Sequence, residues 1–387
     1  MRFPEFSGEW EKCKLGDIAT GFDYGMNAAA KPFDGENKYI RITDIDEASS
    51  TYIDKDIVSP DGTLTENYLV NDRDILLART GASTGKSYLY RKSDGKLYYA
   101  GFLIRANVTK HNPYFVFSQL HTHRYWSWVS IMSARSGQPG INSQEYSSFP
   151  VYVTSLREEE KISALLSIID ERIATQNKII EKLETLIKGI VDSIFTANKF
   201  PKVPFKEIYV RAGEGGTPAT SNPEYYVNGT IPFIKIDDLQ NKYIKTNKDC
   251  ITELGLQKSS AWIVPANSII YSNGATIGAI SINLFPVCTK QGILGVVPKA
   301  DINVEFLYYF MSSTAFTKAV ERIVTEGTMR TAYLKDINHI PCPVPCSVKQ
   351  DEIAKLLSTL SEKLENEVIF QMKLQKQKEF LLSQMFI

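Results

Sequence analysis

Residues 162–194 read ISALLSIIDERIATQNKIIEKLETLIKGIVDSI. Apolar side chains recur along this stretch at alternating spacings of four and three residues, with Gln176 as a polar member of the series. The series consists of Ile162, Leu166, Ile169, Ile173, Gln176, Ile180, Leu183, Ile187, Ile190 and Ile194. This alternation is a heptad seam, the pattern by which one helix packs along another. The sequence therefore predicts a long helix that needs a helical partner.

The C-terminal stretch of the chain supplies a partner with the same pattern. Its seam contains Ile353, Leu357, Leu360, Leu364, Leu374, Leu381 and Met385. Glu367, Gln371 and Lys378 interrupt this seam, and we expect Val368 and Met372, which lie beside it, to carry the packing there. A helix of about 40 residues is about 60 Å long, and neither helix can bury its seam alone. We therefore expect the two helices to pack on each other as an antiparallel coiled coil.

An internal duplication organises the rest of the chain. Short motifs recur in the same order, displaced by between 191 and 194 residues. The matching pairs are Ile40–Asp44 with Ile234–Asp238, Gly81–Gly85 with Gly274–Gly278, Phe149–Val151 with Ile340–Cys342, and Leu165-Leu166 with Leu356-Leu357. Chance can supply one such match but hardly this ordered set. The sequence therefore predicts two copies of one unit.

Each copy begins with a segment rich in glycine, proline, tyrosine and β-branched residues, which is typical of strands and turns with a few helices. A proline-containing exit follows, and then one of the long helices. The predicted fold class is α+β, with two globular α/β segments separated by two long helices and related by an approximate two-fold axis. We expect globular segments at residues 1–154 and 201–346, and helices within residues 155–200 and 347–387.

The composition excludes several classes of protein. Basic and acidic residues number 44 each, so the chain is not a strongly cationic coat for nucleic acid, although a few well-placed Lys and Arg side chains can still bind DNA. No apolar run approaches the roughly 18 residues of a membrane span, and the start of the chain lacks an apolar signal region. We expect a cytoplasmic protein. The 5 cysteines are scattered, and we expect neither a disulfide framework nor a metal site.

Residues 80–87, TGASTGKS, approach the phosphate-binding P-loop but depart from it. Thr80 stands where the P-loop needs its first glycine, and the second copy has Ala279 where Lys86 stands. Nucleotide binding is one interpretation. The others are a tight glycine turn between strands, and a turn near DNA phosphate with Ser83, Thr84 and Lys86 as contacts.

Residues 222–225, NPEY, approach the Asn-Pro-Pro-Tyr motif of amino-methyltransferases. The second proline is missing and no glycine-rich cofactor loop precedes the motif, so we interpret it as a turn. No Ser/His/Asp or paired-carboxylate arrangement is present at a defensible spacing. We therefore expect the chain to do no chemistry itself and to bind no cofactor.

The ordered set of motifs resembles the specificity (S) subunits of type I restriction-modification enzymes. The resemblance is carried by Arg2–Phe6, Gly8–Trp10 and Lys14–Ile18, by the Ile-(Arg/Lys)-Ile-x-Asp strand and the Gly-x-(Ser/Thr)-x-Gly turn of each copy, by Glu159–Ile162 at the helix start, by Leu165–Ser167 and Leu356–Ser358, and by Ile194-Phe195 and Met385-Phe386 at the helix ends. It covers essentially the whole chain and includes the duplication.

This resemblance implies a non-catalytic subunit of a multisubunit restriction endonuclease and DNA adenine methyltransferase. Each globular segment would be a target recognition domain that reads one half of a bipartite, asymmetric site on double-stranded DNA. The helices would set the spacing of the half-sites and dock two methyltransferase (M) subunits, which motor-nuclease (R) subunits then join. S-adenosylmethionine, ATP and magnesium would belong to those partners.

DNA-reading candidates are polar residues on loops, because Arg and Lys suit guanine while Asn and Gln suit adenine. The candidates are Arg41, Arg79, Ser83, Thr84, Lys86, Arg135, Gln138, Asn142, Lys235, Asn273, Thr276, Lys290, Gln291 and Arg330. For each, the alternative is an ordinary surface residue or a phosphate contact.

Two other functions compete with this interpretation. One is an enzyme fragment in which a nuclease is fused to a methyltransferase, which would need the cofactor-loop and catalytic motifs that the sequence lacks. The other is a coiled-coil scaffold with no nucleic-acid role, which a DNA-binding assay in the presence of a methyltransferase partner distinguishes.

Overall fold

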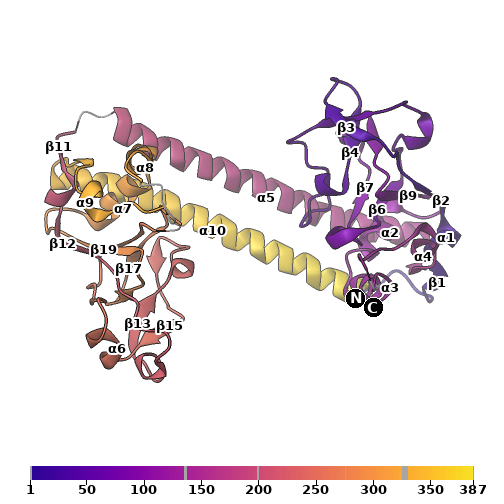
Figure 1. Ribbon diagram of the computed structural model, residues 1–387. Helices are drawn as coiled ribbons and strands as arrows, with labels where there is room; N and C mark the ends of the chain where they lie inside the picture. The colour runs from indigo at the N-terminus through magenta and orange to yellow at the C-terminus, as the bar shows by residue number, and fades with distance from the viewer. Residues whose placement is uncertain (1, 135–136, 198–199, 275, 325–329, 387) are drawn as a thin grey trace. The chain divides into compact units, whose positions relative to one another are not determined.

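A computed structural model describes residues 2–134, 137–197, 200–274, 276–324 and 330–386 (Figure 1). The chain divides into two compact units. Unit 1 comprises residues 1–177 and 369–387, and unit 2 comprises residues 178–368. Each unit contains one globular segment together with parts of both long helices, so each is described by itself.

The heptad stretches form two long helices, as the sequence predicts. Helix α5 spans Leu156–Ala197 and helix α10 spans Ser347–Met385. In unit 1, Ile162 and Leu166 of α5 share an apolar cluster with Leu382 at the end of α10. Farther along, Ile169 and Ile173 pack with Leu374. Residue numbers rise along α5 as they fall along α10, so the two helices run antiparallel within this unit.

The middle of the α10 seam differs from the expectation. Met372 in unit 1 and Val368 in unit 2 are exposed, so these residues do not carry the packing. In unit 1 the seam continues through the polar residues Gln371 and Lys378, which are partly buried. The Lys378 ammonium lies 2.7 Å from a carboxylate oxygen of Asp170 on α5. The aliphatic part of a lysine can cover apolar surface while its ammonium group pairs with a carboxylate at the edge of the helix contact. Lys378 can therefore occupy a seam position that would otherwise hold an apolar side chain.

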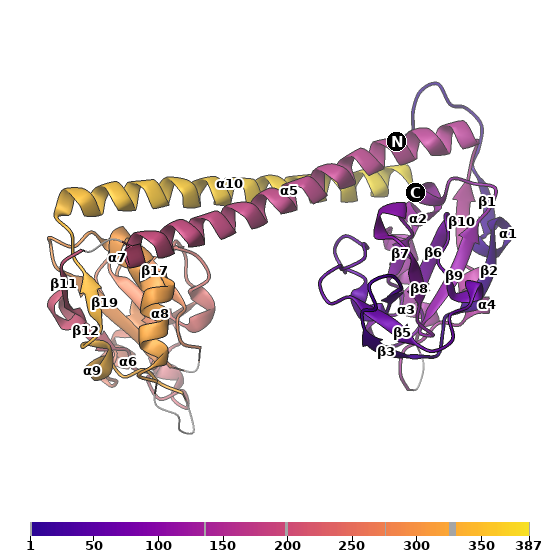
Figure 2. The ribbon, with the colours of Figure 1, turned by 90° about the horizontal axis from the view of Figure 1, so that it is seen from above.

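The core of unit 1 is an antiparallel sheet of strand order β2-β9-β6-β7, flanked by a two-stranded β1-β10 ladder and a parallel β4-β8 pair. The strands are β1 (Glu11–Lys14), β2 (Ala19–Tyr24), β3 (Ala29–Pro32), β4 (Lys38–Ile40), β5 (Val58–Asp61), β6 (Asp74–Ala78), β7 (Ser87–Leu89), β8 (Leu97–Tyr99), β9 (Leu103–Val108) and β10 (Pro150–Val153). The helices are α1 (Leu15–Ile18), α2 (Pro113–Gln119), α3 (His123–Met132) and α4 (Ser143–Ser147). Figure 2 labels these helices and all of these strands except β4, which Figure 1 labels.

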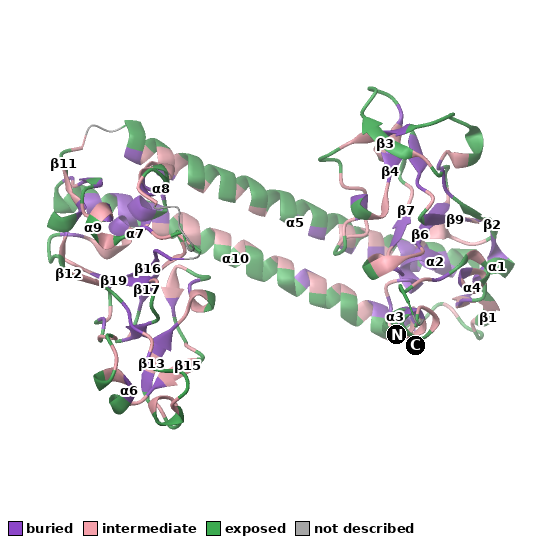
Figure 3. Cartoon of the chain, viewed as in Figure 1, coloured by how far each residue is buried: buried purple, intermediate pink, exposed green. Residues whose placement is uncertain are grey.

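Unit 2 repeats this plan, with sheet order β12-β19-β16-β17-β14, a β11-β20 ladder and a parallel β13-β18 pair. The strands are β11 (Lys202–Pro204), β12 (Tyr209–Glu214), β13 (Ile231–Ile234), β14 (Tyr243–Ile244), β15 (Asp249–Ile251), β16 (Ile269–Ser272), β17 (Ile280–Asn283), β18 (Cys288–Thr289), β19 (Ile293–Pro298) and β20 (Pro341–Pro343). The helices are α6 (Glu253–Gln257), α7 (Val304–Ser312), α8 (Thr314–Glu321) and α9 (Leu334–Ile337). In both units the buried residues gather in the globular segment (Figure 3). The duplication read from the sequence is confirmed.

The Ile-(Arg/Lys)-Ile-x-Asp motif is only partly a strand. Strand β4 ends at Ile40, and a single 3-10 turn, Ile42–Asp44, follows. The Asp44 carboxylate accepts hydrogen bonds from the backbone N–H of Arg41 and from its guanidinium, each at 2.8 Å. The second copy has the same turn, in which Asp238 accepts from the backbone N–H of Lys235 at 2.9 Å. The expected strand is therefore wrong beyond its first residue, because the aspartate satisfies the backbone donor that a strand partner would need.

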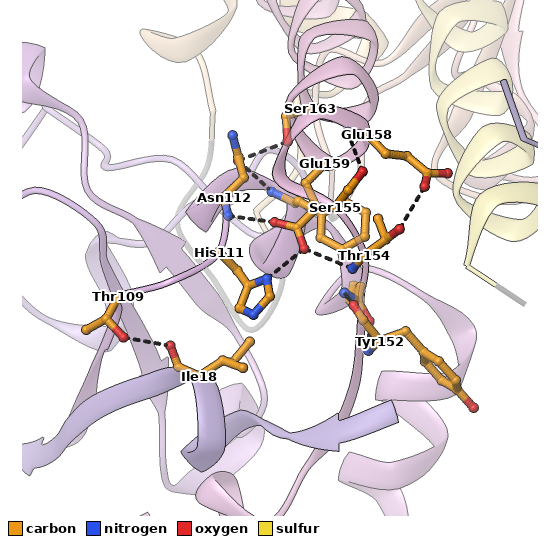
Figure 4. A network of polar contacts seen from close by, with 12 residues as sticks. Ile18, Thr109, His111, Asn112, Tyr152, Thr154, Ser155, Glu158, Glu159 and Ser163 are labelled. Carbon is orange, nitrogen blue, oxygen red and sulfur yellow. Dashed lines mark hydrogen bonds and ion pairs between the residues drawn. The ribbon is translucent and has the colours of Figure 1, made fainter. Parts of the chain in front are cut away.

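The start of α5 is tied to the globular segment by buried polar groups (Figure 4). Glu159 is fully buried, and its carboxylate accepts from the backbone N–H of Asn112 at 2.8 Å and of Thr154 at 3.1 Å. Nδ1 of His111 lies 2.8 Å from the same carboxylate. The Asn112 side chain caps α2 and accepts from Ser163 of α5 at 2.9 Å. The cap of one helix is thereby fixed to the first turns of the other.

Unit 2 builds the same joint with a neutral group. The side chain of Gln350 in α10 accepts from the backbone N–H of Asn303 at 2.9 Å, and Asn303 caps α7 as Asn112 caps α2. Both buried polar groups are satisfied, which a buried donor or acceptor requires.

Beside Glu159, the Glu158 carboxylate is buried against the N-terminal segment of unit 1. The Arg2 guanidinium donates two hydrogen bonds to it, each at 2.7 Å, and Thr154 donates a third. Burial raises the pKa of Glu158, but these donors outweigh it and hold the pKa below its ordinary value. The segment before β1 is therefore attached to the first turn of α5.

An aromatic contact completes each joint. In unit 1, Phe115 of α2 is fully buried, with ring centroids 5.3 Å from Trp10 and 5.2 Å from Phe386 just past α10. In unit 2, Phe306 of α7 lies 5.4 Å from Phe195 near the end of α5. Phe115 and Phe306 occupy the same position in the first helix after the sheet of their unit. Each packs against an aromatic residue at the end of one long helix.

We predict that Phe115→Ala destabilises unit 1 by about 3–5 kcal/mol, the usual cost of deleting a buried phenyl ring. Urea denaturation followed by tryptophan fluorescence measures it, in a Trp262→Phe background so that the remaining tryptophans all lie in unit 1. The matched control is Phe380→Ala, because that ring is 56% exposed and its loss should change the free energy of unfolding by less than about 0.5 kcal/mol. Equal effects of the two substitutions would contradict the anchoring role of Phe115.

Candidate nucleic-acid interface

Three loop segments of unit 1 meet at the end of β6. The backbone N–H of Arg79 donates to the carbonyl of Phe102 in the β8–β9 turn at 3.0 Å. The Arg79 carbonyl accepts from Ile141 at 2.9 Å, and Gly81 donates to Pro139 at 3.0 Å. The chain around Arg79 thus lies between the β8–β9 turn and the loop that carries Gln138. Sequence-predicted residues from separate motifs come together here.

Unit 2 builds the same frame from different residues. The backbone N–H of Asn273 donates to Gly292 at 3.0 Å, and its carbonyl accepts from Ala332 at 2.9 Å. Lys290 and Gln291 occupy the turn that corresponds to β8–β9. The backbone hydrogen bonds are conserved between the copies while the side chains on them differ.

The Arg79 side chain is held in place on its partly exposed site. Its guanidinium lies 4.7 Å from the centroid of the Tyr24 ring, and Nη1 is 3.5 Å from the carbonyl of Gly101. The Tyr24 hydroxyl accepts from the backbone N–H of Ser143 at 3.3 Å, and hydrogen bonding from Ser143 lowers the pKa of Tyr24. The position of the Arg79 guanidinium is therefore fixed by contacts within unit 1. A guanidinium that lies over an aromatic ring still offers its remaining N–H donors to a planar acceptor.

Several other candidates are engaged within the protein. The Arg41 guanidinium forms a bidentate pair with Asp44 at 2.8 Å, and this hydrogen bonding raises the pKa of Arg41. The Lys86 ammonium, which is largely covered, lies 3.2 Å from the exposed carboxylate of Glu47. Thr84 is buried, and its hydroxyl donates to the carbonyl of Gly81 at 2.8 Å. These contacts would have to be exchanged before the side chains could reach a base.

The remaining candidates differ in exposure. Asn142 is exposed but caps α4, accepting from Glu145 at 2.9 Å. Lys235 lies 2.8 Å from Asp249. Asn273 is buried, and its amide donates to Ala332 at 3.1 Å. Gln138, Thr276, Lys290, Gln291 and Arg330 are exposed, and Ser83 is partly exposed. Arg135 lies outside the described residues.

The glycine turn after β6 is a connection between strands. The 3-10 turn Gly81–Ser83 leads from β6 into β7, where a P-loop needs a helix. Gly85 has φ +95 and its counterpart Gly278 has φ +105, conformations that glycine adopts without strain. At Gly85 an added Cβ would lie 2.8 Å from Val129, so the close approach also requires glycine. The turn is the tight connection that the sequence predicts.

Within the described ranges, no helix is long and apolar enough to cross a membrane. The same part of the chain holds no group of three or more His, Cys, Asp or Glu side chains that could bind a metal ion.

A family model described as the type I restriction modification DNA specificity domain matches the chain twice, at residues 7–185 and 202–373. The chain belongs to this family. The matches coincide with the repeated frame, so each copy of the frame is one specificity domain. A role in DNA sequence recognition follows from this membership.

Relatives among known proteins carry the family name. The putative MjaX specificity subunit of Methanocaldococcus jannaschii is 24% identical over 93% of this chain and 89% of its own length. The MjaIX specificity subunit of the same organism is 31% identical over 42% of this chain, and the match spans 38% of that relative. The HindI specificity subunit of Haemophilus influenzae is 31% identical over 39% of this chain and 34% of its own length.

Solved structures from type I restriction-modification systems share the fold. The S subunit of the type I restriction-modification system from M. genitalium aligns with a TM-score of 0.60 at 15% identity, over 98% of this chain and 96% of that one. A chain from a structural study of complex assembly and conformational transition of the type I R-M system aligns with a TM-score of 0.58 at 14% identity, over 97% and 96%.

Sequence reasoning missed two aromatic residues of this candidate interface in the first specificity domain. Tyr24 supports Arg79, and Phe102 occupies the β8–β9 turn with 61% of its surface exposed. Tyr24 lies far from Arg79 in the sequence, so no local pattern signals their contact. For Phe102 a signal existed, since a large apolar residue directly after Gly101 in a turn has no expected partner.

We predict that Arg79→Ala weakens binding of the cognate DNA by about 1–3 kcal/mol and relaxes the base preference at one position. Arg79→Lys should recover the charge but not the bidentate geometry, so the preference should stay relaxed. The matched control is Arg91→Ala, which removes an exposed positive charge from the same unit. Competition binding against DNA with each base pair varied measures both effects. Equal, sequence-independent losses in the Arg79 and Arg91 variants would mean that Arg79 contributes charge alone.

Proposed function

We propose that this chain is the specificity subunit of a type I restriction-modification complex and that each globular segment reads one half of a bipartite, asymmetric DNA site. The observation that carries the proposal is the duplicated backbone frame with unlike side chains. Arg79 corresponds to Asn273, and Gly101 corresponds to Gln291. One frame with different hydrogen-bonding groups suits the reading of two different sequences, because base identity is read by side-chain donors and acceptors.

We further propose that α5 and α10 form an antiparallel coiled coil that sets the separation of the half-sites. Unbroken helices of 42 and 39 residues support this role, as does the antiparallel packing within unit 1. The ion pair between Asp170 and Lys378 supports a fixed register, because polar groups at a seam disfavour shifted pairings.

The same helices serve as docking surfaces for two methyltransferase subunits, to which motor-nuclease subunits are added. Exposed apolar side chains on the unit 1 part of α10 support this assignment, since surface groups of this kind mark interaction sites. They are Ile369, Phe370, Met372 and Phe380. In this scheme the chain is non-catalytic, and S-adenosylmethionine, ATP and magnesium are bound by the partners.

The decisive experiment maps genomic methylation in a host that carries the intact system, and then repeats the mapping after residues 20–150 are exchanged for the matching segment of a relative. We predict that one half-site changes while the other half-site and the gap stay the same, because the exchanged segment contains one complete frame. A change in both half-sites would contradict independent reading. Absence of any methylation motif in the intact system would contradict the proposed function itself.

The spacing role predicts that seven residues inserted after Lys182, with seven more after Asn366, lengthen the unread gap by about three base pairs. Seven residues preserve the heptad and add about 10 Å of helix. The second insertion lies opposite the first if the Asp170–Lys378 register continues along the helices. Three base pairs also rotate one half-site by about 100°, so a loss of binding agrees with the proposal as well. Selection from a library of gap lengths measures the outcome. Recovery of the original gap at full affinity would contradict a spacing role.

A further inference from the structure

Phe102 is the most exposed aromatic side chain in the described part of the chain, at 61%. It belongs to none of the buried apolar clusters that the described residues form, in contrast to Leu103, which follows it. Exposing a phenyl ring to water is unfavourable, by about 25 cal/mol for each Å² of apolar surface. Among the described residues the ring therefore packs into no apolar cluster, and most of its surface faces water.

The backbone that carries this ring is firmly held. Leu103 donates to the carbonyl of Ala100 at 2.8 Å, which closes a tight turn, and Gly101 donates to Met26 at 2.8 Å. The carbonyl of Phe102 accepts from the backbone of Arg79. Hydrogen bonds on both sides of the turn fix the backbone position from which the side chain extends. The exposed ring is therefore carried by an ordered turn.

The fold does not require an aromatic residue at this position. In unit 2 the corresponding residue is Gly292, whose carbonyl accepts from Asn273 at 3.0 Å as that of Phe102 accepts from Arg79. The second turn is closed by the equivalent hydrogen bond, in which Ile293 donates to Lys290 at 3.1 Å. In unit 2 a glycine with φ +84, a conformation that Phe102 does not share, makes these two backbone contacts, so neither contact depends on the phenyl ring of the first copy.

We propose that Phe102 is a specificity-determining residue and that its ring contacts the 5-methyl group of a thymine in the half-site read by the first segment. The inference rests on the proposed function. The thymine methyl is the apolar group that the major groove displays, and phenylalanine is one of the side chains that recognise it. Arg79 is attached to the same turn and offers the donors that guanine accepts, so the thymine lies beside the base pair that Arg79 reads.

Energetics favour this contact over insertion of the ring between base pairs. Insertion unstacks a step at a cost of a few kcal/mol, which proteins that bend DNA offset with additional contacts to the bent duplex. Residues 1–154 contain 17 basic and 18 acidic residues, which leaves no excess of positive charge for that purpose. Lys86, near the turn after β6, is already paired with Glu47. A methyl contact requires no deformation of the duplex.

The test uses the full chain assembled with its methyltransferase partners and the recognition site found by methylation mapping. Each thymine of the half-site assigned to the first segment is replaced singly by deoxyuridine, which lacks only the methyl group. We expect one replacement to weaken binding about fourfold, the loss of one buried CH₂ equivalent. Phe102→Ala should weaken binding of the thymine-containing DNA by at least that factor and should remove the difference between thymine and deoxyuridine.

The controls separate this contact from general effects. Phe33→Ala deletes another exposed phenyl ring of unit 1 and should leave the deoxyuridine effect unchanged. Deoxyuridine in the other half-site should weaken DNA binding by the Phe102→Ala protein and by the original protein equally. Circular dichroism should show the same fold in both variants, because neither ring is buried.

The proposal is overturned if the half-site contains no thymine, if no deoxyuridine weakens binding, or if the Phe102→Ala protein still distinguishes the two bases. It is also overturned if 2-aminopurine placed in the half-site brightens on binding only when Phe102 is present, since that signal reports unstacking. All these outcomes require that the original protein prefers its site. A protein without any site preference would instead contradict the proposed function.

Discussion

Both long helices face the same constraint: an amphipathic helix exposes its seam to water unless something covers it. In unit 1 the beginning of α5 is covered by the end of α10, and the contact with the globular segment is made through Phe115 and Glu159. Burying a carboxylate is costly unless its hydrogen bonds are satisfied, and Glu159 accepts from two backbone N–H groups. Helix capping, helix docking and burial of the seam therefore depend on one another, so the globular segment cannot tilt on the helix without losing several contacts together.

The comparison of Glu159 with Gln350 shows which part of that joint is essential. Both side chains accept the backbone N–H of the asparagine that caps the next helix, Asn112 in one copy and Asn303 in the other. The geometry of the acceptor is kept and its charge is not. In unit 1 the acceptor also lies 2.8 Å from His111, whereas Gln350 uses its own amide to donate to the carbonyl of Pro345 at 3.0 Å. Each copy thus satisfies a buried polar group completely with the atoms that it has available.

Periodicity made the long helices predictable, because a spacing of four and three over many turns has one structural meaning. The globular segments were predictable only as composition and repeated motifs. Where a local polar group competes with a strand, as Asp44 does at the Arg41 backbone, the sequence pattern predicts a strand and the structure has a turn. The engagement of Lys86 by Glu47 was beyond sequence reasoning, because the pairing depends on how distant turns fold together. The support of Arg79 by Tyr24 has the same cause.

The polar residues in and beside the seam have a physical explanation of the same kind. Asp170 of α5 pairs with Lys378 of α10 and also accepts a hydrogen bond from the Tyr114 hydroxyl of α2. Burial raises the pKa of Tyr114, and the neighbouring Asp170 charge raises it further, so the hydroxyl remains a donor.

Nearby, burial lowers the pKa of His121 to about 4, and the Lys378 charge contributes to that shift, so the imidazole is neutral and the lysine is the cation facing Asp170. A shift of α10 by one heptad would leave Asp170 without its counter-charge in a partly buried site. Apolar side chains in place of Asp170 and Lys378 would not make that shift unfavourable. The polar pair buries less apolar surface than two apolar side chains would, but it favours one register of the two helices over shifted ones.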